Sequence, residues 1–247
     1  MGSFRPQNIW LGFGLTLLSA CSTPGNGIRG ELGVGTFDYN CLIASDAACS
    51  ESGAIDAFLA ANDLGSDKDL PRAVAVGSRF GLSYAGTLSD EQGEVLVTTE
   101  AAASEDAIGT EAFQIDAPVS TSFVGTAADG RVVDLIYVEA ATPKGLFIWL
   151  DQESVDSIEL SVGDSLDMTF TLYDEEERLL GGAISSSWQI DDNDIVVLSE
   201  YQATGLPTES TIKNKVDITL SGQSAGSTEL VVTAGAIERT IRIEVTP

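Results

Sequence analysis

The sequence predicts an all-β protein made of two tandem β-sandwiches. Apolar and polar residues alternate over many short runs, which is the pattern of half-buried strands. Glycine and aspartate separate these runs at short intervals, which is typical of turns between antiparallel strands. Only residues 55–59 show the i, i+3, i+4 spacing of a helix, over one or two turns.

The first 20 residues have the composition of a targeting segment and take no part in the predicted fold. Arg5 is their only charge, and the apolar run from Ile9 to Ala20 is too short for a permanent transmembrane helix. Leu17–Cys21 reads Leu-Leu-Ser-Ala-Cys, with a small residue directly before the cysteine. This pattern resembles the lipobox of bacterial lipoproteins.

The lipobox resemblance implies cleavage before Cys21, which would then carry fatty acyl chains such as palmitate and anchor the chain to a bacterial membrane. Residues 21–32 contain Gly, Pro and polar residues, so we expect a flexible tether. The non-acidic Ser22 suggests the outer membrane, according to the enterobacterial sorting pattern. The alternative is an ordinary secretory signal in which Cys21 is incidental.

The charge of the chain restricts its partners. It has 38 acidic and 12 basic residues and no histidine, for a net charge of −26. This disfavours nucleic acid, whose phosphates need Lys and Arg, and it disfavours electrostatic docking on anionic lipid. We interpret the charge as a solubility feature of an exported protein. The alternative is a basic partner, or one bridged by divalent cations.

Two cysteines remain after Cys21 is assigned to lipid. Cys41 and Cys49 form an even pair in an exported, oxidising context, so we predict a disulfide. Closing this short loop would stabilise the fold by on the order of 2–3 kcal/mol. Two free thiols or a metal pair are the alternatives, and the lack of histidine argues against zinc.

Residues 33–150 are predicted to form the first sandwich, which begins with a disulfide-bearing strand at 33–41. Residues 50–70 are interpreted as a long connection and the small, acidic stretch Ala101–Gly109 as a loop. Asp129-Gly130 is a tight-turn signal. The other expected strands are 74–76, 80–84, 94–98, 113–115, 120–126, 132–138 and 146–150.

Residues 151–247 are predicted to form the second sandwich, with the polar stretch 151–156 as the boundary. About seven strands follow, the number in an immunoglobulin-like sandwich. Tyr201–Asn214 is a long insertion before the fifth of them. The expected strands are 158–161, 166–172, 186–190, 195–198, 216–220, 230–233 and 237–245.

Three segments of the second domain match a known family in order and spacing. They are Ile158-x-Leu160-x-Val162-Gly163-Asp164-Ser165, Trp188-Gln189-Ile190-Asp191-Asp192 and Ala225-Gly226-Ser227-Thr228. Residues 157–246 thereby resemble the bacterial immunoglobulin-like group 2 domain. Domains of this family occur in surface adhesins, cell-wall proteins and envelope lipoproteins. The resemblance therefore implies display or recognition and not a reaction.

An internal repeat supports two domains of one kind. Val76-Gly77-Ser78 parallels Val162-Gly163-Asp164 at an offset of 86 residues, and alternating apolar residues follow both. Ala128-Asp129-Gly130 similarly parallels Ala225-Gly226-Ser227. We interpret the chain as two tandem immunoglobulin-like sandwiches, of which the first is the more divergent.

The sequence carries no catalytic motif. Without histidine there is no Ser-His-Asp or Cys-His arrangement, and 38 acids make any carboxylate pair a chance event. We therefore predict no enzymatic activity and no cofactor. Asp191, Asp192, Asn193 and Asp194 offer oxygen ligands for calcium. They fail the EF-hand pattern, so we prefer a solvated turn.

Trp188 has two interpretations, a sugar-stacking platform and the core tryptophan of the third strand; we prefer the core. The functional hypothesis is a non-catalytic, lipid-anchored envelope protein that displays its domains for adhesion, binding or spacing. Its partner would be a protein or a polysaccharide, with Ala101–Gly109 and Tyr201–Asn214 as candidate binding loops. The alternatives are a carboxylate-dependent accessory envelope hydrolase and a periplasmic assembly factor that pairs a client strand.

Overall fold

The computed structural model describes residues 28–40, 46–50, 71, 73–86, 95–99, 103–105, 112–201 and 209–247. Within these ranges the protein is all-β, with one short 3-10 turn, η1, at Ala47–Cys49. The described residues contain no helix with the length and apolar character that crossing a membrane requires. The predicted signal segment, Cys21 and Cys41 lie outside the described residues.

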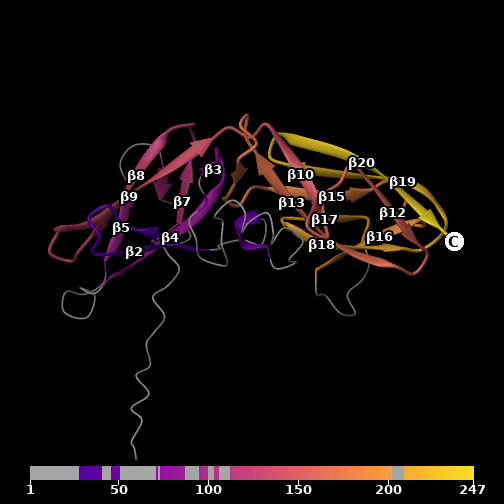
Figure 1. Ribbon diagram of the computed structural model, residues 1–247, viewed down its shortest axis with the longest axis horizontal. Helices are drawn as coiled ribbons and strands as arrows, with labels where there is room; N and C mark the ends of the chain where they lie inside the picture. The colour runs from indigo at the N-terminus through magenta and orange to yellow at the C-terminus, as the bar shows by residue number, and fades with distance from the viewer. Residues whose placement is uncertain are drawn as a thin grey trace, which may run out of the picture.

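Two sandwiches lie end to end (Figure 1), the first in indigo to magenta and the second in orange to yellow. The sheets of the first have the strand orders β1-β2-β4-β7-β6 and β3-β9-β8-β5. Their bounds are β1 Ile28–Arg29, β2 Gly35–Asn40, β3 Ala73–Ala75, β4 Arg79–Gly86, β5 Leu96–Thr99, β6 Ala103–Glu105, β7 Ala112–Ile115, β8 Ser120–Thr126 and β9 Val132–Ala141.

The second sandwich has sheets in the orders β11-β10-β13-β18-β16 and β12-β20-β19-β15-β17, and β14 pairs with β13. Its strands are β10 Gly145–Leu150, β11 Glu153–Ser154, β12 Ser157–Ser161, β13 Ser165–Tyr173, β14 Leu179–Leu180, β15 Ser186–Ile190, β16 Val196–Glu200, β17 Thr211–Lys213, β18 Asp217–Gly222, β19 Gly226–Ala234 and β20 Ile237–Thr246.

The two sandwiches share one topology. The path β2-β4-β7-β6 in the first corresponds to β10-β13-β18-β16 in the second, and β3-β9-β8-β5 corresponds to β12-β20-β19-β15. In both domains the edge strand of the second of these sheets runs parallel to its neighbour, which is the last strand of the domain along the chain: β3 pairs with β9, and β12 pairs with β20. Lettered in chain order, these sheets read A-B-E-D and A′-G-F-C, the immunoglobulin-like arrangement.

The repeat at an offset of 86 residues is confirmed at the turn between strands A′ and B. Gly77 and Gly163 adopt φ of 82° and 90°, a left-handed conformation that glycine adopts without steric cost. The amide of Ser78 donates to the carbonyl of Ala75 over 3.0 Å, as that of Asp164 donates to Ser161 over 3.1 Å.

The second proposed parallel was wrong. Gly130 lies in the turn between β8 and β9, whereas Ala225-Gly226-Ser227 leads into β19. The structural counterpart of Gly130 is Gly235, which joins β19 to β20 and also has a positive φ. A three-residue match of small and turn-forming residues does not distinguish one hairpin from the next.

Each sandwich is filled by the inward residues of its alternating strands. Phe80, Phe113 and Phe123 are fully buried in the first core, with ring centroids 4.9–6.2 Å apart. Trp188 is fully buried in the second core, where its Nε1 donates to the carbonyl of Lys215 over 3.0 Å. The prediction of a core tryptophan is confirmed.

The passage between the domains comes earlier than the predicted boundary at 150/151. Strand β10 pairs with β13 along six residues, and its Leu146 and Ile148 belong to the second core. The chain therefore crosses between sandwiches at Thr142–Lys144. Alternation in 146–150 identifies a strand but does not identify its partner, because a strand can pair in either neighbouring sheet.

Residues 28–32, expected in the tether, belong to the first sandwich. Strand β1 pairs with β2, and the buried carboxylate of Asp134 accepts the amides of Leu32, Val34 and Gly35 over 2.8, 3.0 and 3.1 Å. Burial alone would raise the pKa of Asp134, but the backbone hydrogen bonds outweigh it and lower the pKa. This carboxylate fixes the chain where it enters the fold.

Candidate functional site: the joint between the sandwiches

The calcium candidate forms a turn after β15. Oδ1 of Asp192 accepts the amide of Asp194 over 3.0 Å, and the amide of Asp192 donates to Thr228 over 3.1 Å. All four candidate residues, Asp191, Asp192, Asn193 and Asp194, are described. Within the described ranges, no three or more Asp, Glu or Cys side chains are grouped to hold a metal ion.

The other predicted site residues fall mainly outside the described part. Cys21 and Cys41 lie outside it, so the lipidation and the Cys41–Cys49 disulfide stay predictions. Cys49 ends η1 and packs, half-buried, against the first core. Of the two candidate loops, only β6 in the first and Tyr201 together with 209–214 in the second are described.

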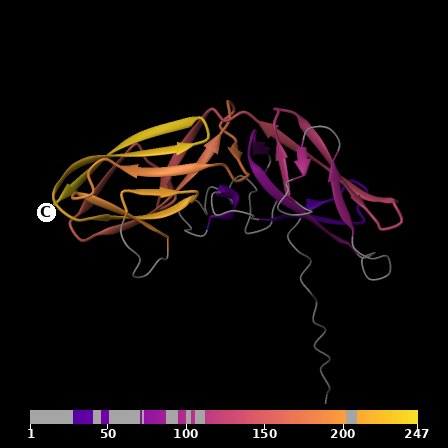
Figure 2. The ribbon, with the colours of Figure 1, turned by 180° about the vertical axis from the view of Figure 1, so that it is seen from behind.

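Instead, several buried contacts of the described residues lie where the two sandwiches meet. Residues 181–183, just after β14, run along the open edge of β3 (Figure 2). The amide of Ala75 donates to the carbonyl of Gly181 over 2.9 Å, and the amide of Gly181 donates to Ala73 over 2.9 Å. Arg79 and Ala183 exchange a second pair of backbone bonds, over 2.7 and 2.9 Å.

This pairing covers an edge strand. All three residues of β3 are fully buried, although β3 is the outermost strand of its own sheet. Exposed edges of sheets carry unpaired amides and carbonyls and invite pairing with other chains. Here residues 181–183 of the second sandwich pair with that edge, so the β3-β9-β8-β5 sheet continues across the domain boundary.

Small residues permit the close approach. A Cβ added to Gly182 would lie 2.0 Å from the hydroxyl of Ser78, and one added to Gly181 would lie 2.4 Å from the ring of Pro71. Gly182 also has a φ of 91°, where side chains are strained. Glycine at both positions therefore meets a steric requirement of the joint.

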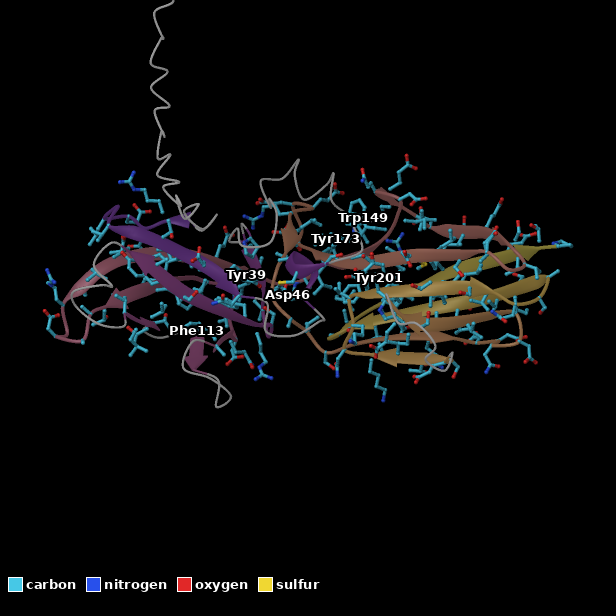
Figure 3. All side chains as sticks on the ribbon, turned by 90° about the horizontal axis from the view of Figure 1, so that it is seen from below. Tyr39, Asp46, Phe113, Trp149, Tyr173 and Tyr201 are labelled. Carbon is cyan, nitrogen blue, oxygen red and sulfur yellow. The ribbon has the colours of Figure 1, made fainter. Side chains whose placement is uncertain are left out.

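Asp46 lies between the two sandwiches beside Tyr39 (Figure 3). Its Oδ1 accepts the amide of Ala48 over 3.0 Å and, from the second domain, the amide of Gly182 over 3.1 Å. Its Oδ2 accepts the hydroxyl of Tyr39 over 2.6 Å. The carboxylate thus joins β2, η1 and the segment after β14.

Burial raises the pKa of Asp46 to about 6, and the three hydrogen bonds oppose this without cancelling it. Burial, followed by the charge of Asp46, raises the pKa of Tyr39 well above its ordinary value. Tyr39 therefore remains a neutral donor at physiological pH. The pair holds the joint in place and presents no reactive phenolate.

The segment that carries η1 also contacts the second sandwich directly. The hydroxyl of Ser50 donates to Oδ1 of Asp217 over 2.7 Å, and Thr169 donates to the same oxygen. Ala47 packs in the second hydrophobic core together with Ala73 and Ala75 of β3. The second core therefore includes residues of the first domain.

Arg178 binds carboxylates of both domains. Its two terminal nitrogens donate to the carboxylate of Glu139 over 3.0 and 2.8 Å, and its Nε donates to Asp174 over 2.8 Å. The hydrogen bonds from Arg178 lower the pKa of Glu139. Because Glu139 is about half exposed, the interdomain pair contributes at most about 1 kcal/mol.

A groove of about 630 Å³ lies beside this ion pair, between the end of β9 and the turn after β13. Its wall carries Lys144 and Glu175, which approach each other to 3.8 Å, together with Glu139 and Arg178. Both signs of charge line it, with four carboxylates (Glu139, Asp174, Glu175 and Glu176) and two cations (Lys144 and Arg178), so the groove is acidic on balance. The arrangement fixes the relative position of two domains and offers no paired nucleophile and base.

Sequence reasoning missed Asp46, Arg178 and Gly182. The available signal was a complementary pair of small-residue runs, Ala73-Val74-Ala75 and Gly181-Gly182-Ala183. Two such runs are suited to close backbone contact, but nothing in the sequence states that they meet.

No protein-family model and no curated protein matches the chain. Among solved structures, domains 4 and 5 of the S-layer protein SbsC are 17% identical, covering 55% of this chain and 69% of that one, with a TM-score of 0.30. The Yersinia pseudotuberculosis adhesin InvE is 11% identical, covering 72% and 57%, with a TM-score of 0.32.

A β-glycosidase from Bacteroides vulgatus is 12% identical over 63% of this chain and 23% of that one, with a TM-score of 0.31. Identities and TM-scores this low assign neither a family nor a function. The resemblance of residues 157–246 to the group 2 domain accordingly stays a prediction.

Proposed function

We propose that the protein is a non-catalytic, lipid-anchored cell-envelope protein. Two immunoglobulin-like sandwiches project from a bacterial membrane, the outer membrane in our proposal, as a spacer or as a binding module for a protein or polysaccharide. The observation that carries this proposal is the joint, where backbone pairing between β3 and residues 181–183 holds the two sandwiches in one orientation.

Domains in tandem move relative to each other unless the interface is large and apolar. In this chain the second core includes Ala47, Ala73 and Ala75 of the first domain, and the Asp46 carboxylate bonds across the boundary. A fixed pair of sandwiches has the geometry of a spacer, because its length does not vary with a hinge angle.

The described N-terminal end supports attachment close to a membrane. Asp134 holds residues 32–35, and β1 begins at Ile28. The six residues 22–27 separate β1 from Cys21. Even fully extended they span only about 20 Å, so acylation at Cys21 would keep the first sandwich near the lipid headgroups.

Buried carboxylates of the described residues have structural partners, which supports a non-catalytic role. Asp46, Asp134 and Asp174 each accept backbone amides, and Asp217 accepts two hydroxyls. A general acid or base must instead reach a substrate.

Metabolic labelling with a palmitate analogue tests the anchor. The intact chain and a Ser22→Ala control are expected to incorporate the label and to stay in the membrane fraction. A Cys21→Ala variant is expected to lose the label and leave that fraction. Label at another residue, or membrane retention of Cys21→Ala, would contradict lipid anchoring at Cys21.

An activity assay tests the non-catalytic role. The intact protein is expected to retain a specific envelope component in a pull-down without degrading it. If the protein hydrolyses an envelope polysaccharide, and one carboxylate substitution abolishes that hydrolysis, the display role is wrong.

A further inference from the structure

Over the residues that the structure describes, the outer surface of the β3-β9-β8-β5 sheet carries almost no charge. Its outward residues alternate with the buried Val97, Phe123, Ile136 and Val138. We call this surface the neutral face; its members are Leu96, Thr98, Ser122, Val124, Thr126, Val132, Leu135 and Tyr137.

The second sandwich provides a matched comparison, because the two domains correspond residue by residue. The amide of Val76 donates to the carbonyl of Ala141, and the amide of Val162 donates to Thr246 in the same way. Counting back four residues from each acceptor places Tyr137 at the position of Arg242.

The strand registers extend this correspondence to the neighbouring strand. Ser122 pairs with Tyr137 in the first domain, and Glu229 pairs with Arg242 in the second, so Ser122 corresponds to Glu229.

The two equivalent surfaces differ in charge. Glu229, Arg242 and Glu244 lie on the outer surface of the second domain. Among the described residues of the first domain, the only charged counterpart is Glu139, which corresponds to Glu244 and is bound by Arg178. In a chain of net charge −26, the described part of this surface on the first domain therefore carries no unpaired charge, whereas the equivalent surface of the second domain does.

The neutral face also exposes apolar side chains. Leu96, Val132 and Tyr137 are 46%, 50% and 61% exposed, and they are half of the large hydrophobic residues found exposed among the described ones. Single exposed apolar residues are ordinary on protein surfaces. Their grouping on one sheet, with no charge between them, indicates an interaction surface.

We propose that the neutral face is where two copies of this chain associate, sheet against sheet. The backbones of packed sheets lie about 10 Å apart, and the side chains of the two facing surfaces interdigitate within that layer. Acidic side chains there would approach to well within the ~8 Å Debye length, and would repel. The neutral face brings no acids into opposition, so two strongly acidic molecules can meet there.

A basic partner fits this surface less well. Such a partner is attracted to carboxylates, which the neutral face lacks and the rest of the chain supplies. A pair of identical copies related by a twofold axis places the same residues on both sides. The rings of Tyr137 and the side chains of Leu96 and Val132 would then form the apolar contact.

Site-directed cross-linking in intact cells tests this pairing on the full chain. A Ser122→Cys variant places a thiol on the neutral face, and Glu229→Cys places one at the matching position of the second domain. With a bismaleimide whose arm spans about 10 Å, the spacing of packed sheets, Ser122→Cys is expected to give a cross-linked dimer beyond the background of the unsubstituted chain. Glu229→Cys is expected to give none.

A charge placed on the face provides the second measurement. Adding Tyr137→Glu to Ser122→Cys is expected to lower the dimer yield at least about tenfold, because two like charges would face each other. Adding Thr240→Glu on the second domain is expected to leave the yield unchanged. Thr98→Cys repeats the test at a second position of the neutral face.

Equal dimer yields from Ser122→Cys and Glu229→Cys would indicate random collisions and overturn the proposal. So would no dimer from Ser122→Cys and Thr98→Cys, or cross-linking only to a different protein. These outcomes do not depend on the palmitate label, so self-association and lipid anchoring can fail separately.

Discussion

Asp46 is a fully buried carboxylate with hydrogen bonds from both domains and a pKa raised to about 6. Because this pKa lies above the ordinary 3.8, folding favours the protonated form. The contribution of Asp46 to stability is fully present below the unfolded pKa and is lost as pH rises through about 6.

An Asp46→Asn variant should remove this pH dependence. The amide keeps an oxygen for the amides of Ala48 and Gly182, and its nitrogen can donate to Tyr39. We expect the variant to exceed the wild type in unfolding free energy by on the order of 3 kcal/mol at pH 7.5 and by only about 1 kcal/mol at pH 4.5. Urea unfolding at both pH values measures this.

Asp134→Asn is the matched control, because Asp134 is equally buried but has a lowered pKa. It accepts four backbone amides, which an amide nitrogen cannot do, so the variant should be destabilised at both pH values. If the difference in unfolding free energy between Asp46→Asn and the wild type stays constant from pH 4.5 to 7.5, the raised pKa of Asp46 is contradicted.

Trp188 fills the centre of the second core, against Phe170 at a ring-centroid distance of 5.7 Å. Trp188→Ala should lower the unfolding free energy by ~3–5 kcal/mol, because it leaves a large cavity and removes one of the two hydrogen bonds to the Lys215 carbonyl. Denaturant unfolding measures this, and near-wild-type stability would contradict a core role.

Among single residues, the sequence was sufficient to predict the burial of Trp188 but not the burial of Asp46. A tryptophan between alternating apolar residues has few positions available in a sandwich. A carboxylate is predicted by default to be solvated, and only the approach of Gly182 from another domain makes Asp46 buried.

Among the elements, the segment after β14 is the one that distinguishes this pair of sandwiches from two separate ones. Gly182→Ala should destabilise the joint, because the new methyl group meets Ser78 and the φ of 91° is strained. Gly77→Ala has nearly the same strain, at 82°, but nothing within 4 Å of the new Cβ.

The difference between these variants therefore isolates the steric contact in the joint. We expect Gly77→Ala to cost roughly 1–2 kcal/mol and Gly182→Ala clearly more. Thermal unfolding of both variants gives the comparison. Equal losses would mean that Gly182 is required only for its backbone conformation.

Strands were predicted well where one face is buried, because alternation then has a strict period. Their partners were not. Strand β10 was placed in the wrong sandwich, and β1 in a tether, since pairing depends on which edge is open. The contact between β3 and residues 181–183 joins segments about 105 residues apart and leaves no local pattern.

For the whole molecule, the shared core predicts one cooperative unfolding transition. Ala47, Ala73 and Ala75 belong to the second hydrophobic cluster, so unfolding the first domain exposes part of the second core. Scanning calorimetry should give one peak whose calorimetric and van't Hoff enthalpies agree. Two resolved peaks would indicate that the joint does not couple the unfolding of the two domains.

Function is the least predictable at this scale. The acidic composition disfavoured nucleic acid, and the missing histidine excluded common catalytic arrangements, but neither identifies a ligand. The neutral face was invisible in the sequence, because it arises only when β5, β8 and β9 are placed side by side and compared with their counterparts.

The covered edge of β3 also has a mechanical consequence. If the connection at 142–144 were the only link, the domains could rotate about it, because one strand of chain transmits tension but not torque. Backbone bonds at Ala73, Ala75 and Arg79 give the load a second route, displaced sideways from the first. Two displaced attachments resist bending and twisting as a beam does, so a lateral force at one end would tilt the whole rod before the joint yields.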